Sequence, residues 1–148
     1  MEYNRSARGI DIEAKAKYDE AERIAKGLCT QLLSLRRNGE LDKELVSTTI
    51  RDIVLAKYYL SHEDAVSEYF NALGELSIAK SLGKSASEVR GLDLEAKCNG
   101  TSSVMTKKIL LMIFLQRELF VEISSEAASN ILTISELADL IYSKLVSS

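Results

Sequence analysis

The 148-residue chain contains no proline, although average usage of about 5% would supply about seven. Proline collects at strand edges and in tight turns, so its absence is typical of chains that are helical throughout. Tryptophan is also absent and aromatic residues make up only 6% of the chain, which leaves Leu, Ile, Ala and Val to form the core. The sequence therefore predicts an all-α fold, built as one domain or as one domain with an appended element.

The spacing of apolar residues predicts a helical bundle of four main helices followed by two short C-terminal helices. The main helices are expected over residues 12–37, 41–60, 61–82 and 102/103–120, and the short ones over 125–130 and 133–145. Ser61 with Asp64, and Thr133 with Glu136, have the spacing of capping boxes at helix starts. Gly83 is expected to end the third helix.

The same spacing predicts which helix faces are buried. The first helix has one apolar stripe, made of Ile12, Ala16, Ala21, Ile24, Ala25, Leu28, Leu32 and Leu35. The buried side of the third helix is expected to contain Val66, Tyr69, Phe70, Leu73, Leu76 and Leu82. Residues 109–115 are apolar on every face of their helix, which predicts that this segment lies at the centre of the bundle.

Charge and composition exclude several classes of partner. The formal net charge is −3 and no basic face is evident, so we expect no nucleic-acid partner. The polar N-terminus lacks the apolar region of a signal peptide, and the longest apolar run, residues 109–115, is far shorter than the ~20 residues of a membrane span. Cys29 and Cys98 are expected to be reduced. These features predict a soluble cytoplasmic protein without a membrane partner.

Familiar catalytic arrangements are missing from the sequence. His62 is the only histidine, and neither a P-loop nor a dinucleotide-binding glycine motif occurs. The best candidate site is the segment that ends in Gly100-Thr101-Ser102-Ser103. Backbone amides, hydroxyl groups and the positive end of a helix dipole suit a phosphate or pyrophosphate. The alternative is that Ser102 or Ser103 simply caps the helix.

Residues 12–112 resemble the C-terminal helical domain of the acyl-CoA dehydrogenase family. The resemblance is carried by Ala56-Lys57-Tyr58-Tyr59, Glu88-Val89-Arg90 with Asp93, and Gly100-Thr101-Ser102-Ser103-Val104 opening a helix. It implies a helical bundle associated with FAD, which Gly100, Thr101, Ser102 and Ser103 would contact. Asn99 stands where many members have the catalytic glutamate, and asparagine cannot remove a proton from an acyl α-carbon. The chain is also expected to lack the other domains of a complete dehydrogenase.

Residues 110–145 are similar to the second half of an acyl carrier protein. The similarity is carried by residues 115–126, Leu-Gln-Arg-Glu-Leu-Phe-Val-Glu-Ile-Ser-Ser-Glu, and by residues 131–141. It implies that Ser103 is the serine that receives 4′-phosphopantetheine, or that Met105 occupies that place if no gap is allowed. The usual Asp-Ser-Leu reads Ser102-Ser103-Val104 here, and Lys107 and Lys108 replace the acidic surface typical of carriers.

These observations predict a division into a bundle, residues 1–112, and a carrier-like tail packed on it, residues 113–148. The function expected first is a stand-alone dehydrogenase-like domain that lacks the catalytic base and serves as a non-catalytic or partner subunit in acyl-thioester metabolism. The alternatives are an acyl or peptidyl carrier modified at Ser103 and a helical protein-interaction module. The expected partners are an acyl-thioester enzyme or a second copy of the chain in a homo-oligomer, because the bundle would leave an apolar face to cover.

Overall fold

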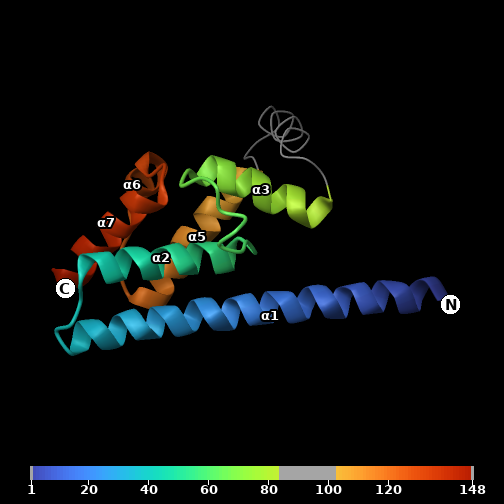
Figure 1. The fold of residues 1–148 in the computed structure, drawn as a ribbon, viewed down its shortest axis with the longest axis horizontal. Coiled ribbons are helices and arrows are strands. Elements are labelled where there is room, and N and C mark those ends of the chain that lie inside the picture. The colour runs from blue at the N-terminus through green and yellow to red at the C-terminus, as the bar shows by residue number, and fades with distance from the viewer. Residues whose placement is uncertain (1, 84–102, 148) are drawn as a thin grey trace.

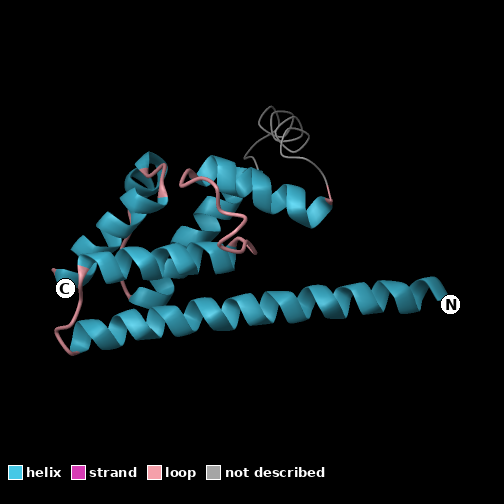
Figure 2. Ribbon diagram, viewed as in Figure 1, coloured by secondary structure: helices cyan, strands magenta, loops and turns pink. Residues whose placement is uncertain are grey.

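The computed structural model describes residues 2–83 and 103–147, with side chains from residue 15 on. Within these residues the fold is all-α, and Figure 2 shows helices joined by loops. The helices are α1 (Glu2–Arg37), α2 (Lys43–Lys57), α3 (Phe70–Leu82), α5 (Ser103–Leu119), α6 (Ser125–Asn130) and α7 (Ile134–Val146). The predicted fold class, with its four main helices and short C-terminal helices, is confirmed.

Helices α1 and α2 form an antiparallel hairpin (Figure 1). The chain turns at Gly39, whose φ of 70° lies in the left-handed region that glycine adopts without strain. Because α1 has 36 residues and α2 has 15, the N-terminal part of α1 extends well past the end of α2 (Figure 1). The hairpin contributes one side of the hydrophobic core, through Ala25, Cys29, Leu32, Val46, Ile50, Ile53 and Val54.

The other side of the core comes from α3, α5 and α7. Helix α7 packs on α2, and α5 packs on both α1 and α3. The fully buried side chains from this half are Phe70, Leu73, Leu111, Leu115, Leu119, Ile134, Leu137 and Ile141. Helices α3 and α5 approach closely at Gly74, where an added Cβ would lie 2.9 Å from Cγ1 of Val104. Residue 112, the predicted domain boundary, falls within α5.

The predicted start of the third helix is wrong. Ser61 and Asp64 do exchange the two capping-box hydrogen bonds, at 3.0 and 3.2 Å, but only a turn follows and α3 begins at Phe70. The Phe70 amide donates to the carbonyl of Leu132 instead, and the two segments form a short antiparallel bridge between Tyr69 and Thr133. This pairing holds the chain extended, so local helix signals lose to a tertiary contact.

Burial around that bridge also differs from the prediction. Val66 is 90% exposed, and Tyr69 and Leu82 are exposed as well, whereas Phe70 and Leu73 are buried as expected. Gly83 ends α3 in the left-handed conformation, as predicted.

Helix α1 begins at Glu2, ten residues before the expected start. Its stripe is confirmed at Ala25 and Leu32, but Ala16 and Ile24 are exposed, and Cys29 is a buried residue that the prediction missed. The side chain of Ile12 lies outside the described residues.

Helix α5 is not buried on every side. Leu111, Met112, Phe114 and Leu115 are buried, whereas Ile109, Leu110 and Ile113 are about half exposed. The predicted central position of residues 109–115 is therefore correct for one face only. The short helices are confirmed: α6 spans the predicted residues, and Thr133 caps α7 by accepting a hydrogen bond from the Glu136 amide.

Candidate functional site

The site predicted from sequence falls largely outside the described residues. Asn99, Gly100, Thr101, Ser102 and Cys98 all belong to the part of the chain that the structure leaves undescribed. Ser103 is the first residue of α5, and its side chain is exposed.

The remaining sequence candidates are surface groups. His62 is exposed, and its Nε2 lies 3.1 Å from Oδ1 of Asp52. Among residues 15–83 and 103–147, no three His, Cys, Asp or Glu side chains cluster in a way that could hold a metal ion.

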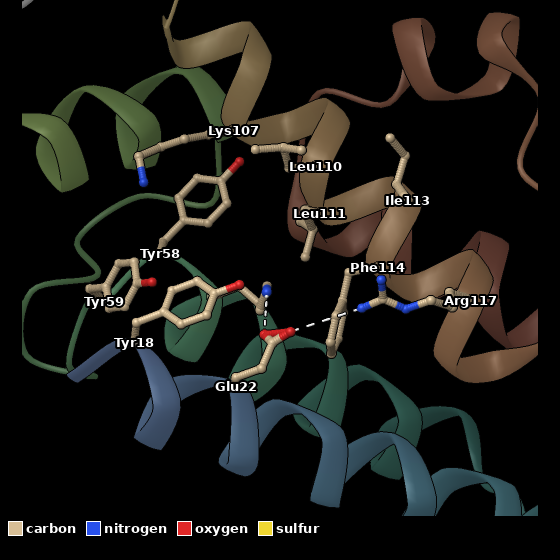
Figure 3. A pocket seen from close by; sticks show the side chains of 11 residues that line it. Tyr18, Glu22, Tyr58, Tyr59, Lys107, Leu110, Leu111, Ile113, Phe114 and Arg117 are labelled. Atoms are coloured by element: carbon tan, nitrogen blue, oxygen red, sulfur yellow. Dashed lines mark hydrogen bonds and ion pairs between the residues drawn. The ribbon is translucent and has the colours of Figure 1, made fainter. Parts of the chain in front are cut away.

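A pocket of about 270 Å³ lies between α1, the C-terminal end of α2, and α5. Its lining combines positive charge, aromatic rings and aliphatic side chains: Tyr18, Glu22, Lys57, Tyr58, Tyr59, Lys107, Leu110, Leu111, Ile113, Phe114 and Arg117. Figure 3 shows the three tyrosine rings on one side, Phe114 and Arg117 on the other, and Glu22 between the two groups. The sequence analysis did not predict this pocket.

Glu22 is the one carboxylate among the described residues that line the pocket, and it joins three helices. Its Oε2 accepts a 2.7 Å hydrogen bond from Nζ of Lys57 on α2, and its Oε1 lies 3.9 Å from the guanidinium of Arg117 on α5. The side chains of Glu22 and Lys57 are each only 18% exposed. An ion pair shielded to this extent is screened by salt less than a surface pair.

The pocket's cations lie against aromatic rings. Nζ of Lys57 is 4.4 Å from the centroid of the Phe114 ring, and Nζ of Lys107 is 5.6 Å from the centroids of both Tyr58 and Tyr59. Contacts of this kind are each worth about 0.5–2 kcal/mol, more where water is excluded. They hold the ammonium groups at the pocket wall.

Burial shifts the pKa values of the pocket residues. It lowers the pKa of Lys107, and the nearby charge of Lys57 lowers it further. It also raises the pKa of the phenols of Tyr58 and Tyr59, so both stay neutral. The Tyr58 residue is 1% exposed and, within the described part of the chain, its hydroxyl has no hydrogen-bond partner. A buried hydroxyl without a partner is costly, which favours a ligand or solvent acceptor beside it.

The end of α2 is fixed in place around the tyrosines. The chain leaves the helix at Tyr59, whose φ of 57° is left-handed, and the Leu60 amide donates to the carbonyl of Leu55 at 2.9 Å. From α3, the hydroxyl of Ser77 donates to the carbonyl of Tyr58 at 2.6 Å. A single sequence signal could have indicated this site, namely the adjacent Lys57, Tyr58 and Tyr59 at a helix end.

The lining of the pocket can bind an anion that carries an apolar group. It holds three cations against one carboxylate, a surplus that attracts an anion, and its aliphatic side chains can hold an apolar group. Cys29 is the one cysteine that the described residues contain; it is buried and free, and it does not line the pocket. No helix of the described residues has both the length and the apolar character needed to cross a membrane. No protein-family model, curated protein or solved structure matches the chain.

Proposed function

We propose that the chain is a non-catalytic helical subunit that binds an anionic acyl thioester of the coenzyme A type, with the α1–α2–α5 pocket as its binding site. The observation that carries the proposal is the convergence of Lys57, Lys107 and Arg117 on a pocket that contains one carboxylate. Coenzyme A thioesters combine phosphate groups with an apolar acyl chain, and both parts have a matching surface at this place.

The two parts of such a ligand would contact different sides of the pocket. Phosphate oxygens accept charge-assisted hydrogen bonds from ammonium and guanidinium groups. The half-exposed side chains of Leu110 and Ile113, with Ile109 one turn away on α5, offer an apolar surface for an acyl chain. A pocket of about 270 Å³ holds a phosphate and its neighbouring atoms, so the rest of the ligand would lie on the surface.

Two features support a binding role without catalysis. Asn99 stands where the resembled dehydrogenases have their catalytic glutamate. Glu22, the one carboxylate among the described lining residues, lies between two cations, so that one of its oxygens faces Lys57 and the other faces Arg117. Both features support the proposed role of a partner subunit in acyl-thioester metabolism.

Calorimetric titration with coenzyme A and with a non-hydrolysable thioether analogue tests the proposal. We expect both to bind to the wild-type chain and Lys107→Met to weaken that binding several-fold. Lys108→Met is the matched control, because Lys108 is the next residue of α5 and does not line the pocket. Equal effects of the two substitutions would contradict the assignment of the pocket. Absorbance of the purified protein near the flavin bands tests the FAD expectation independently.

A second proposal is an acyl or peptidyl carrier, favoured by the exposed position of Ser103 at the start of the 17-residue helix α5. Incubation with coenzyme A and a broad-specificity phosphopantetheinyl transferase, followed by mass spectrometry, tests it. We expect no mass gain for two reasons. The residue directly before Ser103 is not acidic, and two lysines, Lys107 and Lys108, follow Ser103 on the same helix. A gain of one phosphopantetheine arm that Ser103→Ala abolishes would establish the carrier function instead.

The third proposal is an interaction module that works by association with itself or with an acyl-thioester enzyme. The half-exposed apolar residues of α5, Met105, Ile109 and Ile113, favour it, because they are spaced four residues apart along one helix face. Light scattering at several concentrations tests self-association. A monomer at every concentration would remove the homo-oligomer from this proposal.

A further inference from the structure

The three cations of the pocket differ in whether a carboxylate lies near them. Lys57 and Arg117 both lie near the Glu22 carboxylate, at 2.7 and 3.9 Å. Lys107 contacts the rings of Tyr58 and Tyr59, and it approaches no carboxylate of the described residues. The pocket therefore contains an internal anion on one side and, on the other, a cation that has no anionic neighbour in the described part of the chain.

The Glu22 carboxylate makes a close contact with Lys57 and a more distant one with Arg117. The Glu22 and Lys57 side chains are both mostly buried, and their contact is short. Arg117 is 60% exposed and its distance to Glu22 is long, so water weakens that contact. Arg117 also lies beside Glu118, at 3.3 Å. Lys57 is thus the cation whose availability depends most directly on Glu22.

We infer that Glu22 acts as a built-in competitor, an internal counter-ion that an anionic ligand must displace from Lys57 in order to bind fully. The inference rests on the proposed function of the pocket. The ligand's anionic group first meets Lys107, and it then replaces the Glu22 carboxylate as the partner of Lys57. Glu22 therefore sets how much negative charge a ligand needs in order to bind fully, and it excludes anions of low charge from the pocket.

The test measures how Glu22→Gln changes the affinity for a small anion. Phenyl phosphate is a suitable probe because it joins a phosphate to an aromatic ring, and benzyl alcohol is its uncharged counterpart. Glutamine keeps the size of the side chain and can still accept a hydrogen bond from Lys57. We expect Glu22→Gln to bind phenyl phosphate about tenfold more tightly than wild type, since a mostly buried competing charge is removed. Its affinity for benzyl alcohol should equal that of wild type.

Glu20→Gln is the matched control. It removes the same charge from the same helix, but Glu20 pairs with Arg23 at 2.6 Å and does not line the pocket. We expect it to change the affinity for phenyl phosphate less than twofold, because exposed charges are screened. An equal gain in Glu20→Gln and Glu22→Gln would mean that net charge alone matters and would overturn the inference.

The outcomes separate the two proposals. If phenyl phosphate binds to neither wild type nor Glu22→Gln, the proposed function of the pocket fails. If wild type binds it and Glu22→Gln binds it equally or more weakly, the pocket stands and the role of Glu22 as a competitor is overturned. If Glu22→Gln does not fold, the carboxyl carbon resonance of Glu22 in the wild-type chain decides. It should shift on saturation with phenyl phosphate, and an unchanged resonance in the bound protein would overturn the inference.

Discussion

The hydroxyl of Ser77 on α3 donates a 2.6 Å hydrogen bond to the backbone carbonyl of Tyr58, at the C-terminal end of α2. Both residues are buried, and 19 positions separate them along the chain. The carbonyl at the end of a helix has no partner within that helix, so it needs one from elsewhere. Ser77 supplies it and thereby fixes the turn that carries Tyr58 and Tyr59 into the pocket.

Ser77→Ala should lower the free energy of unfolding by about 1–3 kcal/mol, because it leaves the buried Tyr58 carbonyl without a partner. Ser81→Ala is the control, since the Ser81 hydroxyl is exposed and bonds only within its own helix, to the carbonyl of Ile78. That change should stay within about 0.5 kcal/mol of wild type. Urea unfolding measures both, and equal stabilities of the two variants would contradict the role given to Ser77.

The same substitution should have opposite effects at two glycines. Gly74→Ala should destabilise the chain by about 1–3 kcal/mol, because the new methyl would lie 2.9 Å from Cγ1 of Val104 in a tight helix contact. Gly27→Ala should stabilise it by about 0.5–1 kcal/mol, because Gly27 lies inside α1 with open space around its Cα. Thermal unfolding checks the signs, and a stabilised Gly74→Ala would refute the close packing of α3 on α5.

Cys29 should be unreactive in the folded chain. Burial raises the pKa of its thiol to about 12, with a smaller contribution from Glu118 that Lys57 opposes, so little nucleophilic thiolate forms at mildly alkaline pH. In a Cys98→Ser background, alkylation by iodoacetamide should be at least ~100-fold slower in buffer than in concentrated urea, since it requires local opening. Comparable rates in the two solutions would show that Cys29 is accessible.

Asp64 should titrate at an unusually low pH. The hydrogen bond from Lys80, followed by those involving Ser61, lowers the pKa of the Asp64 carboxyl to about 2. A carboxyl whose pKa is lower in the folded than in the unfolded chain stabilises the fold above its unfolded pKa. That contribution disappears as the pH falls from about 4 through 2. A carboxyl carbon NMR titration of Asp64 should have its midpoint at about pH 2. Lys80→Met should move this midpoint up toward 3.8, the ordinary value. An unchanged midpoint in Lys80→Met would contradict the Lys80 contact.

The helices could be predicted from sequence where local signals and packing agree. The Thr133 cap and the Gly83 stop depend on residues close in sequence, and both were predicted correctly. The start of α3 was not, because Phe70 bonds to Leu132, a residue 62 positions away that no local pattern identifies. The open face of α5 was missed for a related reason, since an apolar helix gives no indication of how many neighbours it has.

Beyond the adjacent Lys57, Tyr58 and Tyr59, the pocket could not be predicted, because its parts come from three helices. Glu22, Lys57 and Arg117 have no spacing in sequence that relates them, and only the packing of α1 and α5 around the end of α2 brings them together. Lys107 shares a helix face with Leu111 and Phe114, which looks from sequence like ordinary amphipathic patterning. The motif that did stand out, Gly100 to Ser103, lies mostly outside the described residues.

Mapping of amide chemical shifts shows directly whether the α1–α2–α5 pocket binds an anionic ligand. Coenzyme A would be titrated into the ¹⁵N-labelled chain while the amide spectrum is recorded. We expect the largest shifts at Lys57, Tyr58, Tyr59, Lys107 and Phe114, and we expect them to saturate. No shifts at millimolar coenzyme A, or shifts centred on α6 and α7 instead, would contradict binding in this pocket.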